Sequence, residues 1–225
     1  MSEAAVIDRR VRVSGQTTSS TLLAGVRART PGAWERFEAL YRPLVLYWCQ
    51  QDGLRPHDAQ DVSQDVFLAA DRAMDRFRHD QPGDTLRGWL RMITRNKAHD
   101  HRRRNARQIP AVGGSDAQRE LLSVPERPER GGGADADAVE ERIVLRQAVE
   151  LTLAGFKDRT RQAFWRYMID RQRAEDVAQE LGIRVHSVYL AKSRVLHRLL
   201  EEFGELVDLP EDGAPRPATG SDAAG

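Results

Sequence analysis

The sequence contains a single cysteine, Cys49, and this scarcity limits the chemistry open to the chain. One thiol cannot form an internal disulfide, and it excludes a zinc site built from several cysteines. Cys49 follows the apolar run 44–48, which favours a packed core thiol over a nucleophile, because free cysteine usually behaves as a small buried hydrophobe. A chain without disulfides fits a reducing cytosol.

Long apolar runs are also missing. No stretch approaches the roughly 18 apolar residues that are needed to span a membrane. The first 21 residues include basic side chains but no apolar segment after them, so they are not expected to act as a secretory signal. These absences predict a soluble, cytoplasmic protein that does not insert into a membrane.

Patterns for catalysis, metals and cofactors are absent from the sequence as well. Of the six histidines, His99 and His101 lie two residues apart, so they cannot share one face of a helix to hold a metal. No Ser-His-Asp arrangement, paired carboxylates or phosphate-binding glycine loop is apparent. The sequence therefore predicts a protein that is not an enzyme, with no catalytic residue, no metal site and no cofactor.

Charged residues are abundant at 31%, yet the formal net charge is only +1, because the two signs are segregated along the chain. Acidic residues dominate 58–77 and basic residues dominate 86–107, with Pro82-Gly83 between them. Two neighbouring helices of opposite sign predict two partners: a basic or polar protein surface for the first and phosphates for the second. The plainer alternative is a helical bundle with ordinary solvated charge.

Hydrophobic periodicity predicts an all-α protein of two small domains. Apolar residues at three- to four-residue spacing predict helices over 22–29, 33–52, 58–77, 86–104, 139–154, 158–169, 174–181 and 185–203. Within the basic helix we expect Trp89, Leu90, Met92 and Ile93 to face inward. A disordered extension is predicted over 1–20, a first helical domain over 21–107, a flexible Pro- and Gly-rich linker over 108–138, a second domain over 139–207 and a disordered tail over 208–225.

The second domain carries the spacing of a helix-turn-helix. Ala178 lies four residues before Gly182, and Val188 follows it by six. A small residue lets two helices approach, glycine adopts the left-handed turn, and a β-branched residue packs the second helix on the first. The second helix of such a motif enters the major groove. The helix-turn-helix spacing therefore predicts DNA contacts from Arg184, His186, Ser187, Tyr189, Ser193 and Arg194. The alternative is a helical hairpin without a DNA role.

Taken together, these segments resemble bacterial RNA polymerase sigma factors of the extracytoplasmic-function (ECF) group of the sigma-70 family. The resemblance covers 22–107 and 139–206 and identifies the two domains as sigma region 2 and sigma region 4. It implies that the acidic helix binds the clamp helices of the polymerase β′ subunit through Asp61, Gln64 and Asp65. The helix-turn-helix corresponds to the part that reads the minus-thirty-five element.

The basic helix resembles the part of the family that melts and reads the minus-ten element. Its spacing of basic residues predicts phosphate contacts from Arg91, Arg95, Lys97, Arg103 and Arg104. Asn96 matches the place where the family captures a flipped base. The expected partners are core RNA polymerase (the β′ clamp helices and the β flap), promoter DNA and an anti-sigma factor, with a monomer when free.

One departure and two alternatives accompany the resemblance. Many family members carry a Lys-Ser-Arg run directly after the valine of the recognition helix, where this chain has 189–191 with the sequence YLA. A free-standing DNA-binding regulator is the first alternative, although no dimer seam is visible in the sequence. A helical adaptor that binds only proteins is the second, and it would leave the basic cluster 102–107 without a purpose.

Overall fold

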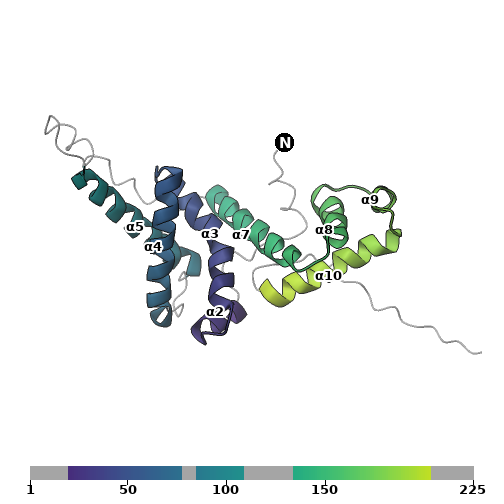
Figure 1. The fold of residues 1–225 in the computed structure, drawn as a ribbon, viewed down its shortest axis with the longest axis horizontal. Helices are drawn as coiled ribbons and strands as arrows, with labels where there is room; N and C mark the ends of the chain where they lie inside the picture. The colour runs from purple at the N-terminus through teal and green to yellow at the C-terminus, as the bar shows by residue number, and fades with distance from the viewer. Residues whose placement is uncertain (1–19, 78–84, 109–133, 204–225) are drawn as a thin grey trace, which may run out of the picture. The chain divides into compact units, whose positions relative to one another are not determined.

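The computed structural model describes residues 20–77, 85–108 and 134–203, and every regular element within these ranges is a helix (Figure 1). The elements are α2 (Ser20–Arg27), α3 (Ala33–Gln51), α4 (Pro56–Ala73), the 3₁₀ helix η1 (Met74–Arg76), α5 (Leu86–Gln108), α7 (Ala134–Ala154), α8 (Asp158–Phe164), the π-helix η2 (Trp165–Ile169), α9 (Ala174–Leu181) and α10 (Val185–Phe203). The predicted all-α class is confirmed. The predicted disordered tail, nearly all of the predicted disordered extension and most of the predicted linker lie outside the described residues.

The chain divides into two compact units, and the division falls within α7, between Gln147 and Ala148. The sequence had indicated a boundary at 138/139, with all of the following helix in the second domain. Instead, α7 begins at Ala134, inside the stretch predicted as linker, and its part up to Gln147 belongs to the N-terminal unit. Sequence periodicity could not show this division, because one continuous helix contributes residues to both units.

The core of the N-terminal unit is formed by α3, α4 and α5, with α2 packed against α3. Phe37 is fully buried and contacts three other aromatic rings: those of Trp34, Tyr41 and Phe67, with centroids 5.2, 5.0 and 6.3 Å away. The apolar stripe predicted for 33–52 is therefore the face that packs. Burying aromatic side chains in this way stabilises a core more than any other residue type does.

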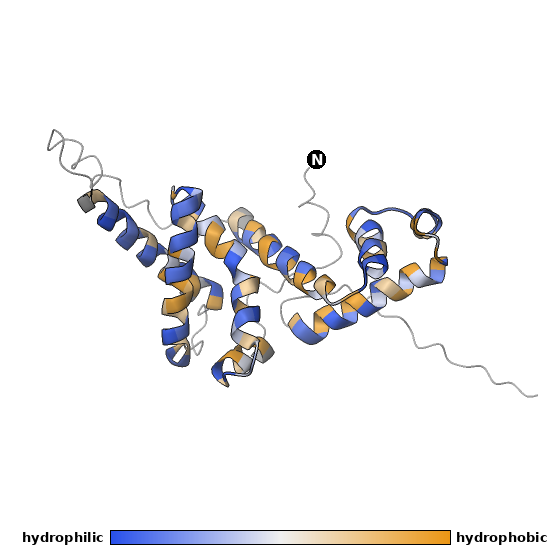
Figure 2. Ribbon diagram, in the orientation of Figure 1, coloured by the Kyte–Doolittle hydropathy of each residue, from blue (hydrophilic) through white to orange (hydrophobic). Residues whose placement is uncertain are grey.

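The C-terminal unit contains α8, η2, α9 and α10 together with the end of α7. The bounds of α9 and α10 agree with the predicted helices. Gly182 ends α9 in the left-handed region at φ 60°, and the Ile183 N–H donates to the Ala178 carbonyl at 2.9 Å. Val188 is completely buried against α8 and α9. The predicted helix-turn-helix geometry is thus present, and Figure 2 shows hydrophobic and hydrophilic residues alternating along α10 as one buried stripe requires.

Two predicted helices differ in detail from the observed ones. The segment predicted as helix 58–77 begins earlier, with Pro56 in the first turn, where its missing N–H costs nothing, and its last turn is the 3₁₀ helix η1. The segment predicted as helix 158–169 changes from α8 to the π-helix η2 at Trp165. Such changes of helical type depend on tertiary packing rather than on periodicity.

Cys49 is fully buried on α3, as the sequence predicted. Burial raises the pKa of its thiol to about 11, and the nearby negative charge of Asp52 adds to the shift. Because the thiolate is the reactive form, we expect native protein at pH 8 to react with a thiol-specific disulfide reagent at least ~100-fold more slowly than urea-unfolded protein. Absorbance of the released chromophore measures this, and equal rates in the two states would contradict the burial.

The same pKa shift makes stability depend on pH. The unfolded thiol ionises near its ordinary pKa of 9.0, whereas the folded thiol stays protonated until about 11. The contribution of this thiol to folding is therefore complete below pH 9 and is lost as pH rises through 9 to 11, by about 1.4 kcal/mol per unit of pKa shift. A Cys49→Ala variant should lack this component of the alkaline destabilisation in urea titrations.

Candidate functional site

The acidic residues predicted to bind a protein lie on one side of α4. Asp61 and Gln64 are exposed and Asp65 is half-buried, and their i, i+3, i+4 spacing places them together. Leu68 was not predicted to join them, yet it continues this row one turn later and is 56% exposed. An exposed leucine beside carboxylates is typical of a protein-binding surface, where an apolar contact is surrounded by polar groups. The helical wheel of 58–73 contains the signal that would have identified Leu68.

An ion pair and a histidine–carboxylate contact link this acidic helix to the basic helix α5. The Arg104 guanidinium lies 3.2 Å from the Asp65 carboxylate, and His101 Nε2 lies 3.4 Å from the Asp58 carboxylate. The structure therefore brings together Asp65 and Arg104, which the sequence had assigned to two different partners. Both side chains of the Arg104–Asp65 pair are substantially exposed, so the pair contributes little to stability and can exchange for other partners.

The six residues predicted to contact the minus-ten element do not share one face of α5. Arg95, Asn96 and Arg103 are exposed and project from the side opposite the buried Leu86, Leu90 and Ala98. Lys97 is half-buried, and Arg104 lies on the flank next to α4. Arg91 is on the opposite flank. The outward face, not the whole set, is therefore the part of α5 that a ligand reaches first.

Met92 lies on the same outward face and is 55% exposed, so the prediction that it faces inward is wrong. In a helix of 3.6 residues per turn, Met92 is two positions from the buried Leu90, which turns it to the solvent side. Its apolar character alone suggested burial. An exposed methionine beside Asn96 adds a flexible apolar contact to an otherwise polar face.

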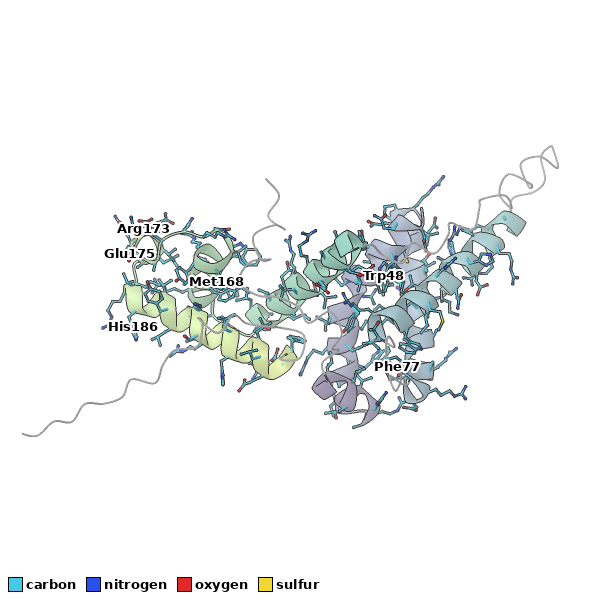
Figure 3. All side chains as sticks on the ribbon, turned by 180° about the vertical axis from the view of Figure 1, so that it is seen from behind. Trp48, Phe77, Met168, Arg173, Glu175 and His186 are labelled. Atoms are coloured by element: carbon cyan, nitrogen blue, oxygen red, sulfur yellow. The ribbon has the colours of Figure 1, made fainter. Side chains whose placement is uncertain are left out.

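Arg91 is held by residues of α3 and α7. Its Nη1 lies 3.2 Å from the Glu140 carboxylate, and its guanidinium carbon lies 5.9 Å from the centroid of the Trp48 ring. Glu140 also accepts a hydrogen bond of 2.8 Å from Trp48 Nε1, and Figure 3 labels Trp48 in the N-terminal unit. Glu140 was not predicted from the sequence, because the residue is 92 positions from Trp48 in the chain.

Trp89, which was predicted to face inward, and Trp34 of α3 are both half-buried and packed. The Trp89 ring lies 4.9 Å from that of Phe77, centroid to centroid, and Trp34 packs on Phe37 and Phe67. Arg27 of α2 donates to the Phe77 carbonyl at 2.6 Å, so Phe77 (labelled in Figure 3) connects α2 to the start of α5. This packing fixes the N-terminal turn of the basic helix.

The helix-turn-helix presents most of its predicted DNA-contacting residues to solvent. Arg184, His186, Tyr189 and Arg194 are exposed, whereas Ser187 and Ser193 are half-buried. Tyr189 packs edge-on against Tyr167 of η2 at 5.6 Å, which orients its ring while leaving it 44% exposed. His186, labelled in Figure 3, lies in the first turn of α10, the part that enters the major groove in this motif.

Leu190 follows Tyr189 and is 38% exposed. Residues 189–190, where the resemblance implied the start of a Lys-Ser-Arg run, thus expose an aromatic and an aliphatic side chain. The Leu190 side chain has no hydrogen-bond donor, whereas Tyr189 keeps its hydroxyl, so neither supplies the cationic donors of a Lys-Ser-Arg run. The departure seen in the sequence is therefore located on the outer surface of the recognition helix.

A pocket of about 410 Å³ lies in the C-terminal unit between the end of α7, α8 and η2. Its lining includes Leu153, Ala154 and Trp165 together with charged residues of α7, α8 and η2.

Within the described ranges, no three His, Cys, Asp or Glu side chains converge as a metal site requires. No helix in those ranges has both the length and the apolarity needed to cross a bilayer.

Comparison with known proteins gives three kinds of match. Residues 39–108 match the family model for sigma-70 region 2. The ferric citrate uptake sigma factor FecI of Escherichia coli (strain K12) is 29% identical over 172 residues, which cover 73% of this chain and 89% of that protein. The region matched by the family model includes α4 and α5, where the candidate residues of the N-terminal unit lie.

Two solved structures are also similar, at low TM-scores. A chain of the RsbN–BldN complex is 15% identical with a TM-score of 0.32, and the match covers 80% of this chain and 99% of that one. A chain of the structure of CnrH in complex with the cytosolic domain of CnrY is 22% identical with a TM-score of 0.32, covering 81% and 94%.

Proposed function

We propose that the chain is a sigma factor of the sigma-70 family, in its ECF group, that binds core RNA polymerase and directs promoter-specific transcription initiation. The observation that supports this most is the pairing of α4 and α5 in one unit. The first presents carboxylates around an exposed leucine, and the second presents arginines and an asparagine on its outer face. The two faces suit a protein partner and a nucleic acid.

The proposed contact with the polymerase is the row Asp61, Gln64, Asp65 and Leu68 on α4. The carboxylates would pair with basic side chains of the β′ clamp helices, and Leu68 would lose its solvent exposure. Charged pairs guide association and orientation, whereas a buried apolar residue at the centre supplies most of the affinity. Leu68 is our addition to the set that the resemblance implies.

The proposed contact with the minus-ten element is the outer face of α5. A base cannot be read on its Watson–Crick edge while it is stacked, and extruding it costs a few kcal/mol. Arg95 and Arg103 would bind phosphates of the separated strand, and Asn96 would hydrogen-bond an extruded base. Lys97, Arg104 and Arg91 flank this face and would extend the phosphate contacts.

The proposed contact with the minus-thirty-five element is the start of α10, through Arg184, His186, Ser187, Tyr189, Ser193 and Arg194. The C-terminal unit would also bind the β flap of the polymerase, and an anti-sigma factor is a further proposed partner. The chain would act in the cytoplasm as a monomer until it joins the polymerase. It would need no cofactor, because the polymerase supplies the catalysis.

Transcription from a mixed template tests this function. Bacterial core polymerase is incubated with sheared genomic DNA from the source organism, with and without the chain, and the 5′ ends of the transcripts are sequenced. We expect new, discrete start sites only when the chain is present, preceded by two shared sequence elements. Absence of new starts, with a folded chain and cognate core enzyme, would contradict the proposal and favour a free-standing DNA-binding regulator.

A further inference from the structure

Glu140 is an unusual residue to find in a protein interior. Its side chain is 6% exposed, although it lies in the second turn of α7, where the neighbouring acids reach solvent. Buried glutamates are rare unless they are paired, because removing a carboxylate from water is costly. Glu140 meets this cost with two donors: Trp48 Nε1 at 2.8 Å and Arg91 Nη1 at 3.2 Å.

A second pair lies next to the first. Glu141 of α7 is 3.4 Å from Arg87 of α5, and both side chains are less than one-third exposed. Arg87 and Arg91 are one helical turn apart, so Glu140 and Glu141, hereafter the acidic pair, engage two consecutive arginines on one flank of α5. The segment 134–147 is therefore bound to α3 and α5 by specific polar contacts within the N-terminal unit.

The acidic pair occupies the donors that nucleic acid would need. A guanidinium recognises carboxylate and phosphate with the same N–H groups, so Arg91 bound to Glu140 presents fewer donors to a phosphate. Two carboxylates beside α5 also repel a phosphate backbone that approaches this flank. Arg95 and Arg103 lie on the outward face of α5, so the acidic pair does not occupy their N–H donors.

We propose that the segment 134–147 of α7 is an intramolecular competitor of single-stranded nucleic acid for the Arg87–Arg91 flank of α5. In the free chain the acidic pair neutralises this flank, and when the strand binds, its phosphates replace the two carboxylates on Arg87 and Arg91. The inference rests on the proposed role of α5 in binding the separated strand. The resemblance to the family did not imply that residues of α7 regulate binding at α5.

The test uses the full-length chain and a fluorescent dT20 oligonucleotide as the probe, measured by anisotropy at several salt concentrations. Glu140→Gln keeps an oxygen that accepts from Trp48 Nε1 but removes the negative charge that faces Arg91. Glu35→Gln is the matched control, since it makes the same change in net charge at an exposed position near the start of α3. Two further variants, Arg91→Ala and the double variant Arg91→Ala, Glu140→Gln, show whether the effect of Glu140→Gln depends on Arg91.

We expect Glu140→Gln to bind dT20 about threefold to tenfold more tightly than Glu35→Gln, as one additional phosphate contact would produce. The gain should disappear in the Arg91→Ala background. Equal affinities for Glu140→Gln and Glu35→Gln, or a gain that persists without Arg91, would overturn the inference. Circular dichroism of each variant verifies that it is folded.

A readout without DNA separates this inference from the proposed function. The indole N–H of Trp48 is bonded to Glu140, so in wild type its NMR signal should be protected from solvent exchange, and Glu140→Ala should exchange it at least ~10-fold faster. Rapid exchange in wild type would show that the acidic pair is not bound, whatever the DNA result. If Trp48 is protected but none of the proteins binds dT20, the proposed role of α5 in binding the strand is contradicted. The competition between the acidic pair and the strand is then contradicted as well.

Discussion

Replacing Val188 by aspartate is expected to unfold the C-terminal unit and leave the N-terminal unit folded. Val188 is fully buried among Ala163, Val177, Ala178 and Ala191, with no cation in that cluster to pair with a carboxylate. An unpaired buried charge costs about 3–5 kcal/mol, which is most of the stability of a small helical unit. The substitution would also remove the apolar side chain of Val188, which packs α10 against α9.

The indole signals of the four tryptophans report on this change. Trp165 lies in the C-terminal unit, and the other three lie in the N-terminal unit. In Val188→Asp, the Trp165 signal should move to its unfolded position while the others stay. Leu190→Asp is the matched control, because Leu190 is on the same helix but exposed, and it should keep the Trp165 signal. Identical spectra for the two variants would contradict the assigned core.

Reversing the charge of Arg95 and Arg103 together is expected to weaken binding of dT20 by roughly 100-fold at low salt. Each arginine that is replaced can no longer neutralise a phosphate, and each glutamate that is introduced repels the strand. The slope of log affinity against log salt should fall in magnitude by about 0.7 for each phosphate that is no longer neutralised. Both side chains are exposed, so the variant should retain its fold.

The control for this prediction reverses Arg36 and Arg55 instead. Both are exposed in the N-terminal unit but lie on or before other helices. Reversing two arginines changes the net charge by the same amount in both variants. A small, general weakening is expected from charge alone, with little change in the salt slope. If the two double variants lose affinity equally, the outer face of α5 is not a specific binding surface, and the strand binds by net charge.

Most of the fold followed from periodicity and turn chemistry. The helix-turn-helix bounds could be predicted because Gly182 needs a left-handed conformation and because Val177, Val188 and Val195 recur on one side. The predictions that failed depended on tertiary context. Met92 is apolar but turned outward, and the division within α7 arises from contacts of its early turns with α3 and α5.

The candidate residues were predictable by type but not by grouping. The sequence marks α5 as basic, but only the fold separates Arg91 from Arg95 and directs it to Glu140. The partner of Arg91 is distant in the chain, and a polar residue in an amphipathic helix gives no sign of its burial. Leu68 shows the converse: its exposure follows from the same helical wheel that places Asp61 and Gln64 outward.

Binding to bacterial core RNA polymerase is the decisive measurement for the proposed function, with wild type compared to an Asp61→Arg, Asp65→Arg double variant. Both positions reach solvent, so the variant should remain folded, and its arginines would repel a basic partner surface. We expect tight binding of the wild type and a loss of at least ~100-fold in the variant. A Glu35→Arg, Asp52→Arg variant, altered at exposed acids of the N-terminal unit outside α4, makes the same change in net charge and is expected to bind like the wild type. Failure of folded wild type to bind its cognate core enzyme, or equal binding by the Asp61, Asp65 variant, would contradict the role of α4 in docking.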